Sequence, residues 1–123
     1  MIYGIGIDLI EVARFREVDP EGSPFTLEEI TYCQSKRYPE QHYAGRFAAK
    51  EAFFKALGSG ALTPGEFRMV EVVRDDLGRP GLKFSGVVAE RVAEAQVSRI
   101  NLSLTHTRII AAAVVVLEVP GFE

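Results

Sequence analysis

The chain has 123 residues, a formal net charge of −3 at pH 7 and 47% hydrophobic residues. This length suits one domain over residues 1–123, and the composition is that of an ordinary globular protein, not of a disordered or fibrous one. The acidic balance argues against a nucleic-acid binder, which would need an excess of lysine and arginine.

The cysteine count and the short apolar segments indicate a cytoplasmic protein. Cys33 is the only cysteine, so an internal disulfide is excluded and a reducing compartment is expected. Asp8 interrupts the first apolar segment and no basic residue precedes it, which argues against a secretory signal peptide. The longest apolar run, residues 109–117, is less than half a membrane span. We therefore expect a cytoplasmic protein without membrane contact.

The first predicted element is a β-strand over residues 1–10. Apolar residues at positions 5, 7 and 9 alternate with Gly4, Gly6 and Asp8, so the two faces of the strand differ sharply. Glycine inside a strand often marks the close approach of another backbone or a ligand. In the simpler interpretation, the sheet packs tightly on a helix and Asp8, at the end of the strand, caps a helix that begins near Ile10.

Helices are predicted for much of the next part of the chain. A short helix over residues 11–18 leads into a loop at residues 19–24. Thr26 begins a capping-box sequence for a helix that runs through Cys33. The central helix is expected from Pro39, which suits a first helical turn, to Gly58, which suits the position after the last.

The second half of the chain is mainly β in pattern. A glycine-rich loop at residues 58–65 precedes a predicted strand at 67–74, a reversal and a second strand, and a helix follows from residue 86. The last two strands are expected at residues 99–107 and 109–119, and the second of them is apolar enough to be central. The predicted fold class is α+β, with a small, mainly antiparallel sheet packed on a long central helix, plus shorter helices.

The central helix places a glutamate on its apolar face. Phe47, Glu51 and Phe54 are three or four residues apart and share one side of a helix that turns about 100° per residue. A carboxylate held away from water costs several kcal/mol unless it is paired or binds a metal. A surface ion pair with Lys55, four residues on, explains the position equally well on helical geometry alone.

Two carboxylates are the strongest candidates for chemistry. Asp8 and Glu51 offer hard oxygen ligands of the kind that Mg²⁺ binds together with water and a substrate phosphate. Nearby cations, glycines and hydroxyls favour phosphoryl chemistry, although neither a Walker motif nor a dinucleotide fingerprint is present. The spacing of Cys33, His42 and His106 matches no zinc pattern.

Three segments together resemble a known family. "GIGIDLIEVARF" at residues 4–15, "RFAAKEAFFKALG" at 46–58 and "SLTHT" at 103–107 are similar, in this order, to the holo-(acyl-carrier-protein) synthases, the short-chain branch of the 4′-phosphopantetheinyl transferase superfamily. The resemblance implies the fold of that superfamily and transfer of the phosphopantetheine arm of coenzyme A to a serine of apo-acyl carrier protein. Adenosine 3′,5′-bisphosphate would be released, and the reaction would support fatty acid biosynthesis.

The resemblance also implies roles for particular residues. Asp8 and Glu51 match the metal ligands, for Mg²⁺ with Mn²⁺ as the alternative, and Glu51 also matches the base that acts on the serine directly or through water. Lys55 matches the lysine that assists the departing phosphate. Arg14 matches a carrier-docking position, with Arg16 as a less certain helper. The positions that match the binding site for the nucleotide part of coenzyme A are Arg46, Lys50, His106 and Thr107.

The implied assembly is a homotrimer with its sites between subunits, because longer members of the superfamily carry two such halves in one chain. Carrier proteins are acidic and so is this chain, so a local basic patch must overcome the overall repulsion. Three alternatives remain open: a catalytically silent homologue that binds coenzyme A or a carrier protein, a different Mg²⁺-dependent phosphotransferase, and a structural trimer whose carboxylates serve only in ion pairs.

Overall fold

The computed structural model describes residues 1–60 and 63–121. In chain order its elements are β1 (Ile2–Glu11), the 3-10 helix η1 (Val12–Phe15), α1 (Leu27–Gln34), α2 (Pro39–Leu57), α3 (Pro64–Arg68), β2 (Val70–Arg74), β3 (Pro80–Phe84), α4 (Gly86–Glu94), β4 (Arg99–His106) and β5 (Ile110–Glu118). The strands form a three-stranded sheet in the order β1-β5-β4 and a two-stranded sheet of β2 and β3, all antiparallel. The α+β class is confirmed, and so is the central position of the last strand.

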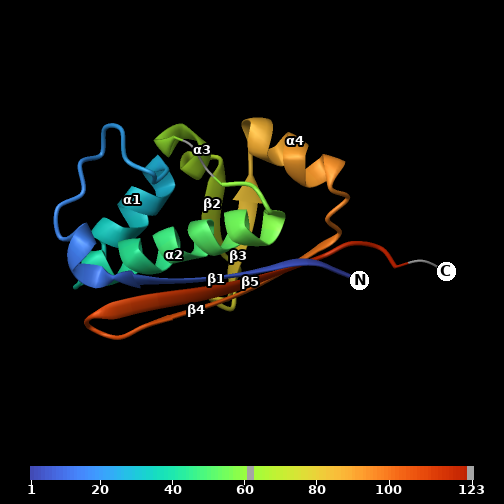
Figure 1. Ribbon diagram of the computed structural model, residues 1–123. Helices are drawn as coiled ribbons and strands as arrows, with labels where there is room; N and C mark the ends of the chain where they lie inside the picture. Colours follow the sequence, from blue (N-terminus) through green and yellow to red (C-terminus); the bar gives the residue numbers. More distant parts are fainter. Residues whose placement is uncertain (61–62, 122–123) are drawn as a thin grey trace.

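The long helix α2 lies along one face of the three-stranded sheet, and the other helices lie on the same side (Figure 1). Glycines on β1 make this approach possible. A Cβ atom on Gly4 would lie 1.9 Å from the carbonyl oxygen of Ala56, and one on Gly6 would lie 1.8 Å from that of Ala52. Only glycine permits such contact between the two backbones. Asp8, two residues further along the same face of β1, is thereby directed toward α2.

The helix boundaries follow the local signals in the sequence. The helix α2 begins at Pro39, and Gly58 follows its end in the left-handed conformation, with a φ of 86°. The capping box at α1 is also present: Thr26 accepts a hydrogen bond from the backbone N–H of Glu29, whose side chain accepts one from the backbone N–H of Thr26. These predictions are confirmed.

Two predicted boundaries were wrong. Asp8 does not cap a helix, because β1 continues to Glu11, which pairs with Ile110 of β5. A 3-10 helix of four residues follows instead, without a side-chain cap. The strand predicted from residue 67 begins at Val70, because Thr63 caps the short helix α3 through a hydrogen bond from the backbone N–H of Glu66.

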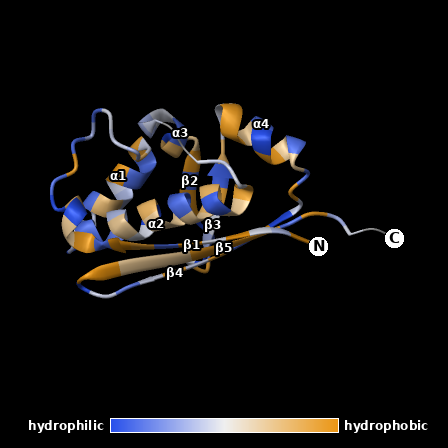
Figure 2. Cartoon of the chain, viewed as in Figure 1, coloured by the Kyte–Doolittle hydropathy of each residue, from blue (hydrophilic) through white to orange (hydrophobic). Residues whose placement is uncertain are grey.

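The outer face of the three-stranded sheet is open, and it is apolar along β1. Ile5, Ile7 and Leu9 of β1 project from it, with exposed fractions of 60%, 67% and 66%. Hydrophobic residues also predominate along the neighbouring strand β5 (Figure 2). No described helix lies over this face (Figure 1), and among the described residues no helix is long and apolar enough to cross a membrane.

Candidate functional site

The contact between β1 and α2 brings Asp8 and Lys55 together. The Lys55 ammonium donates hydrogen bonds to Asp8 Oδ1 at 3.1 Å and to the backbone oxygen of Ile7 at 3.0 Å. The side chain of Asp8 is largely buried, whereas that of Lys55 is 53% exposed. The lysine therefore spans from the helix to the strand at the edge of the sheet while its ammonium remains open to solvent.

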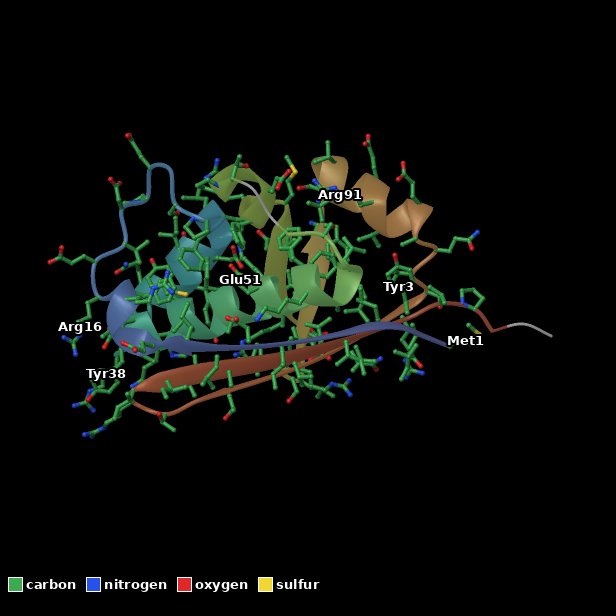
Figure 3. All side chains as sticks on the ribbon, viewed as in Figure 1. Met1, Tyr3, Arg16, Tyr38, Glu51 and Arg91 are labelled. Carbon is green, nitrogen blue, oxygen red and sulfur yellow. The ribbon has the colours of Figure 1, made fainter. Side chains whose placement is uncertain are left out.

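Glu51 lies midway along α2 (Figure 3). It precedes Lys55 by four residues, about one turn, so the two side chains share a face of the helix. It is half-buried, and among the described residues it has no hydrogen-bond or ion-pair partner. Burial and the neighbouring Asp8 carboxylate raise the pKa of Glu51, opposed by the positive charges of Lys55 and Arg14. The two carboxylates predicted from distant parts of the sequence therefore lie near enough for their charges to interact.

This pair of carboxylates suits a divalent cation. A nearby positive charge would offset two costs: the partial burial of the unpaired Glu51 carboxylate and its repulsion from the Asp8 carboxylate. In the part of the chain that is described, no group of three or more His, Cys, Asp and Glu side chains is placed to hold a metal. Two carboxylates would leave the remaining positions to water and to phosphate oxygens, which is how Mg²⁺ usually binds.

A second cluster lies on the other side of α2 and is strongly basic. A cavity of about 220 Å³ is lined by Gln41, His42, Gly45, Arg46, Arg74, Leu104, Thr105 and His106. Burial and the positive charges of Arg46, His106, Lys36 and Arg74 lower the pKa of His42. A concentration of positive charge without a carboxylate in its lining is the setting that an anionic ligand requires.

The basic cavity contains two of the predicted residues, Arg46 and His106, beside two that sequence reasoning missed, His42 and Arg74. Arg46 is only 3% exposed. Its guanidinium lies 4.1 Å from the centre of the Tyr32 ring, and its Nε has no hydrogen-bond partner among the described residues. The spacing of His42 and Arg46, four residues apart on α2, was the available signal, because such residues share a helix face.

Two predicted ligand residues lie elsewhere. Lys50 is completely buried, and its ammonium donates to Glu29 Oε1 at 2.6 Å and to the backbone oxygens of Pro24 and Phe67. Its assignment to the coenzyme A site is therefore corrected to a structural role, since a surface ligand does not reach it. Thr107 is next to His106 but outside the cavity, and its hydroxyl accepts hydrogen bonds from the backbone N–H groups of the β4–β5 turn.

Arg14, the predicted docking residue, is exposed on η1 directly after β1. Its positive charge opposes the rise in the pKa of Glu51, to a smaller extent than that of Lys55 does. Arg14 is therefore an exposed cation whose charge reaches the carboxylate pair.

The acidic and the basic clusters lie at opposite edges of one sheet. Asp8 belongs to β1 and His106 to β4, and β5 separates these strands. On α2, Glu51 follows Arg46 by five residues, which rotates the two side chains about 140° apart around the helix. A ligand that contacts both clusters therefore needs either to pass around α2 or to lie between two copies of the chain.

Comparisons with known proteins identify the family of the chain. The family model of the 4′-phosphopantetheinyl transferase superfamily matches residues 4–114. Together with the fold, this match shows that the chain belongs to the 4′-phosphopantetheinyl transferase superfamily.

Within the superfamily, the chain is similar to holo-(acyl-carrier-protein) synthases. The chain is similar to a holo-(acyl-carrier-protein) synthase of Geobacter sp. strain M21, with 45% identity over 96% of this chain and 99% of the relative. Among solved structures, the synthase from Neisseria meningitidis has a TM-score of 0.84 and 33% identity, over 96% of this chain and 99% of that one. The synthase from Bacillus anthracis, solved in complex with coenzyme A (3′,5′-ADP), has a TM-score of 0.75 and 34% identity, over 98% of this chain and 99% of that one.

Proposed function

We propose that this chain transfers the 4′-phosphopantetheine group of coenzyme A to a serine of an apo-acyl carrier protein. The observation that carries the proposal is the convergence of Asp8, Glu51 and Lys55 where β1 contacts α2. The synthase names of the relatives and the coenzyme A complex of the Bacillus anthracis protein support the same donor and acceptor.

The proposed step is an in-line attack by the serine oxygen on the β-phosphorus of coenzyme A. Glu51 takes the serine proton, directly or through a water, and its raised pKa makes it a better proton acceptor than an ordinary carboxylate. As the new P–O bond forms, the bond from phosphorus to the oxygen of adenosine 3′,5′-bisphosphate breaks. The Lys55 ammonium, exposed beside Asp8, stabilises the negative charge that develops on that oxygen.

Asp8 and Glu51 would hold the magnesium ion that reactions of this kind use, with Mn²⁺ as a substitute of similar ligand preference. The bound cation would supply charge neutralisation at the pyrophosphate. Lys55, which bonds to Asp8 in the structure, would be released toward the substrate when the Asp8 carboxylate is neutralised.

The nucleotide part of coenzyme A fits the basic cavity. Arg46 and His106 line it and can offer N–H donors to the phosphates of the ligand. Arg74 adds to the positive potential there. His42, whose pKa is lowered, contributes a neutral imidazole, and Thr107 lies at the margin of the cavity through its neighbour His106. Lys50 is not part of this proposed site.

The site is proposed to form between subunits of a homotrimer. The open apolar face of the three-stranded sheet supports self-association, because each large apolar side chain removed from water contributes about 1.5–3 kcal/mol. A site between subunits would require the β4 edge of one subunit to lie beside the β1 edge of the next. The number three comes from the resemblance to the short-chain synthases.

Arg14 is proposed to dock the acidic carrier protein, since it is exposed beside Glu51 and its charge is of the required sign. The proposed compartment is the cytoplasm, with which the buried free thiol of Cys33 is compatible.

The test is direct transfer. The purified chain is incubated with an apo-acyl carrier protein, coenzyme A and Mg²⁺, and the carrier is weighed by mass spectrometry. A gain of one phosphopantetheine is expected, and it should be absent when coenzyme A or the chain is omitted. No gain despite tight binding of coenzyme A would favour the catalytically silent homologue.

A further inference from the structure

Tyr32, on α1, lies at the centre of a group of cations. The Lys36 ammonium is 4.6 Å from the centre of its ring, the Arg46 guanidinium carbon 4.1 Å and the Arg74 guanidinium carbon 5.6 Å. These side chains come from the turn after α1, from α2 and from β2. The face of an aromatic ring is electron-rich and attracts each of them.

None of these three cations forms an ion pair with a carboxylate within the described residues. Like charges held so close together repel one another, and Arg46 is buried with its Nε unpartnered. An anion that joined this group would offset the repulsion among its cations.

The ring also contacts the histidines of the cavity. Tyr32 meets the His42 imidazole edge to face, with 5.9 Å between ring centres, and His42 meets His106 at 5.8 Å. Tyr32 thus contacts three of the residues that line the basic cavity, Arg46, Arg74 and His42, and is connected through His42 to a fourth, His106. It is not itself among the lining residues.

A tyrosine suits this place better than an acidic residue would. A carboxylate would hold Arg46 as firmly but would neutralise its charge before a substrate arrives. An aromatic ring fixes the direction of the guanidinium and leaves its full charge available. Preorganised charge of this kind lowers the entropy lost when the ligand binds.

We propose that Tyr32 is a positioning residue, whose ring holds Arg46 and His42 in the orientation that binds a phosphate of the nucleotide part of coenzyme A. The inference rests on the proposed function, since it assigns a role within the same cavity. It assigns Lys36 and Arg74 a supporting role as fixed positive charges around that phosphate.

The experiment changes the negative charge on the face of the ring at position 32 while the shape of the ring stays nearly constant. Tyr32→Phe and a variant with 3,4,5-trifluorophenylalanine at position 32 are compared with Tyr32→Leu, which removes the ring. Calorimetry measures the Kd for adenosine 3′,5′-bisphosphate, and steady-state assays measure KM and kcat with coenzyme A.

We expect Tyr32→Phe to match the wild-type chain and the trifluoro variant to bind about two- to fivefold more weakly. Tyr32→Leu should bind about three- to tenfold more weakly, with KM for coenzyme A raised and kcat nearly unchanged. The His42 imidazole resonances should also shift less on ligand addition in Tyr32→Leu than in Tyr32→Phe. Equal affinity of the Phe and trifluoro variants, which differ in the charge of the ring face and little in shape, would overturn the proposal even if Tyr32→Leu fails to fold.

The outcomes separate this inference from the proposed function. If the chain transfers phosphopantetheine but the Tyr32 variants all bind adenosine 3′,5′-bisphosphate with the wild-type Kd, the role of Tyr32 is refuted and the proposed function stands. If the wild-type chain binds neither adenosine 3′,5′-bisphosphate nor coenzyme A, the coenzyme A assignment fails, and the role of Tyr32 fails with it.

Discussion

The Lys50 ammonium lies 2.6 Å from Glu29 Oε1, and both side chains are almost completely buried. The same carboxylate accepts hydrogen bonds from the backbone N–H groups of Thr26 and Val72. This ion pair thus joins α2 to the start of α1 and to β2. Its lysine, Lys50, directly precedes Glu51 in the chain.

Lys50→Met should destabilise the fold strongly. Removing one partner leaves the Glu29 carboxylate buried without its cation, at a cost of about 3–5 kcal/mol in the free energy of unfolding. The matched control is Lys55→Met, the same change on the same helix at an exposed site, for which a loss below about 1 kcal/mol is expected. Urea denaturation measures both, and equal losses would contradict the structural assignment of Lys50.

Glu51→Gln should make the protein more stable at neutral pH. The pKa of Glu51 is raised in the folded state, so the folded chain holds the proton more tightly than the unfolded chain does, and ionisation opposes folding. The two chains should be equally stable below the usual carboxyl pKa of 4.5. Their difference should grow as the pH rises from there through the raised pKa. Thermal unfolding across that range measures it, and a stability loss in the variant at pH 7 would contradict the sign.

Asp8→Asn and Glu51→Gln should each lower the rate of transfer by at least about 10², by analogy with the loss of one preorganised charge. Glu94→Gln, an exposed carboxylate on α4, is the control and should retain the wild-type rate. Single-turnover mass spectrometry of the carrier gives the rates. A loss of less than fivefold in either site variant would exclude that carboxylate from the chemistry.

Arg14→Glu should raise KM for the carrier protein, on the order of tenfold, because it reverses the charge that attracts an acidic partner. The Kd for coenzyme A should stay nearly the same, since Arg14 lies outside the basic cavity. Lys83→Glu makes the same charge change on β3 and should have little effect. A parallel loss of affinity for both substrates would refute the docking role of Arg14.

Ile7→Glu should dissociate the assembly without unfolding the chain. Ile7 is 67% exposed in the single chain, so its replacement removes little of the core but places a charge in the proposed interface. Leu77→Glu, at a 78% exposed site in the β2–β3 turn, is the control. Light scattering during gel filtration should show trimers for wild type and control and smaller species for Ile7→Glu; an unchanged mass would place the interface elsewhere.

Features encoded by neighbouring residues could be read from the sequence. The bounds of α2 depend on Pro39 and Gly58, and the alternation around Gly6 predicted the tight contact with a helix. The end of β1 could not be predicted, because pairing with Ile110, far away in the chain, extends the strand past Asp8.

The site shows the same division. The helical pattern located Glu51, and the structure brings Asp8 to it. Lys50 was misassigned because its burial depends on Glu29, a residue from another helix. The cations around Tyr32 come from separate elements, and only the spacing of Tyr32 and Lys36, four residues apart, pointed to any of that group.

The order of strands in the large sheet has a consequence for the living cell under the proposed arrangement. Because β5 keeps Asp8 and His106 on opposite edges, each copy of the proposed trimer would carry two half-sites that its neighbours complete. The transferase activity would then increase more than in proportion to the concentration of the polypeptide. A modest fall in expression would therefore reduce the conversion of the carrier protein by a larger factor than it reduced the amount of polypeptide.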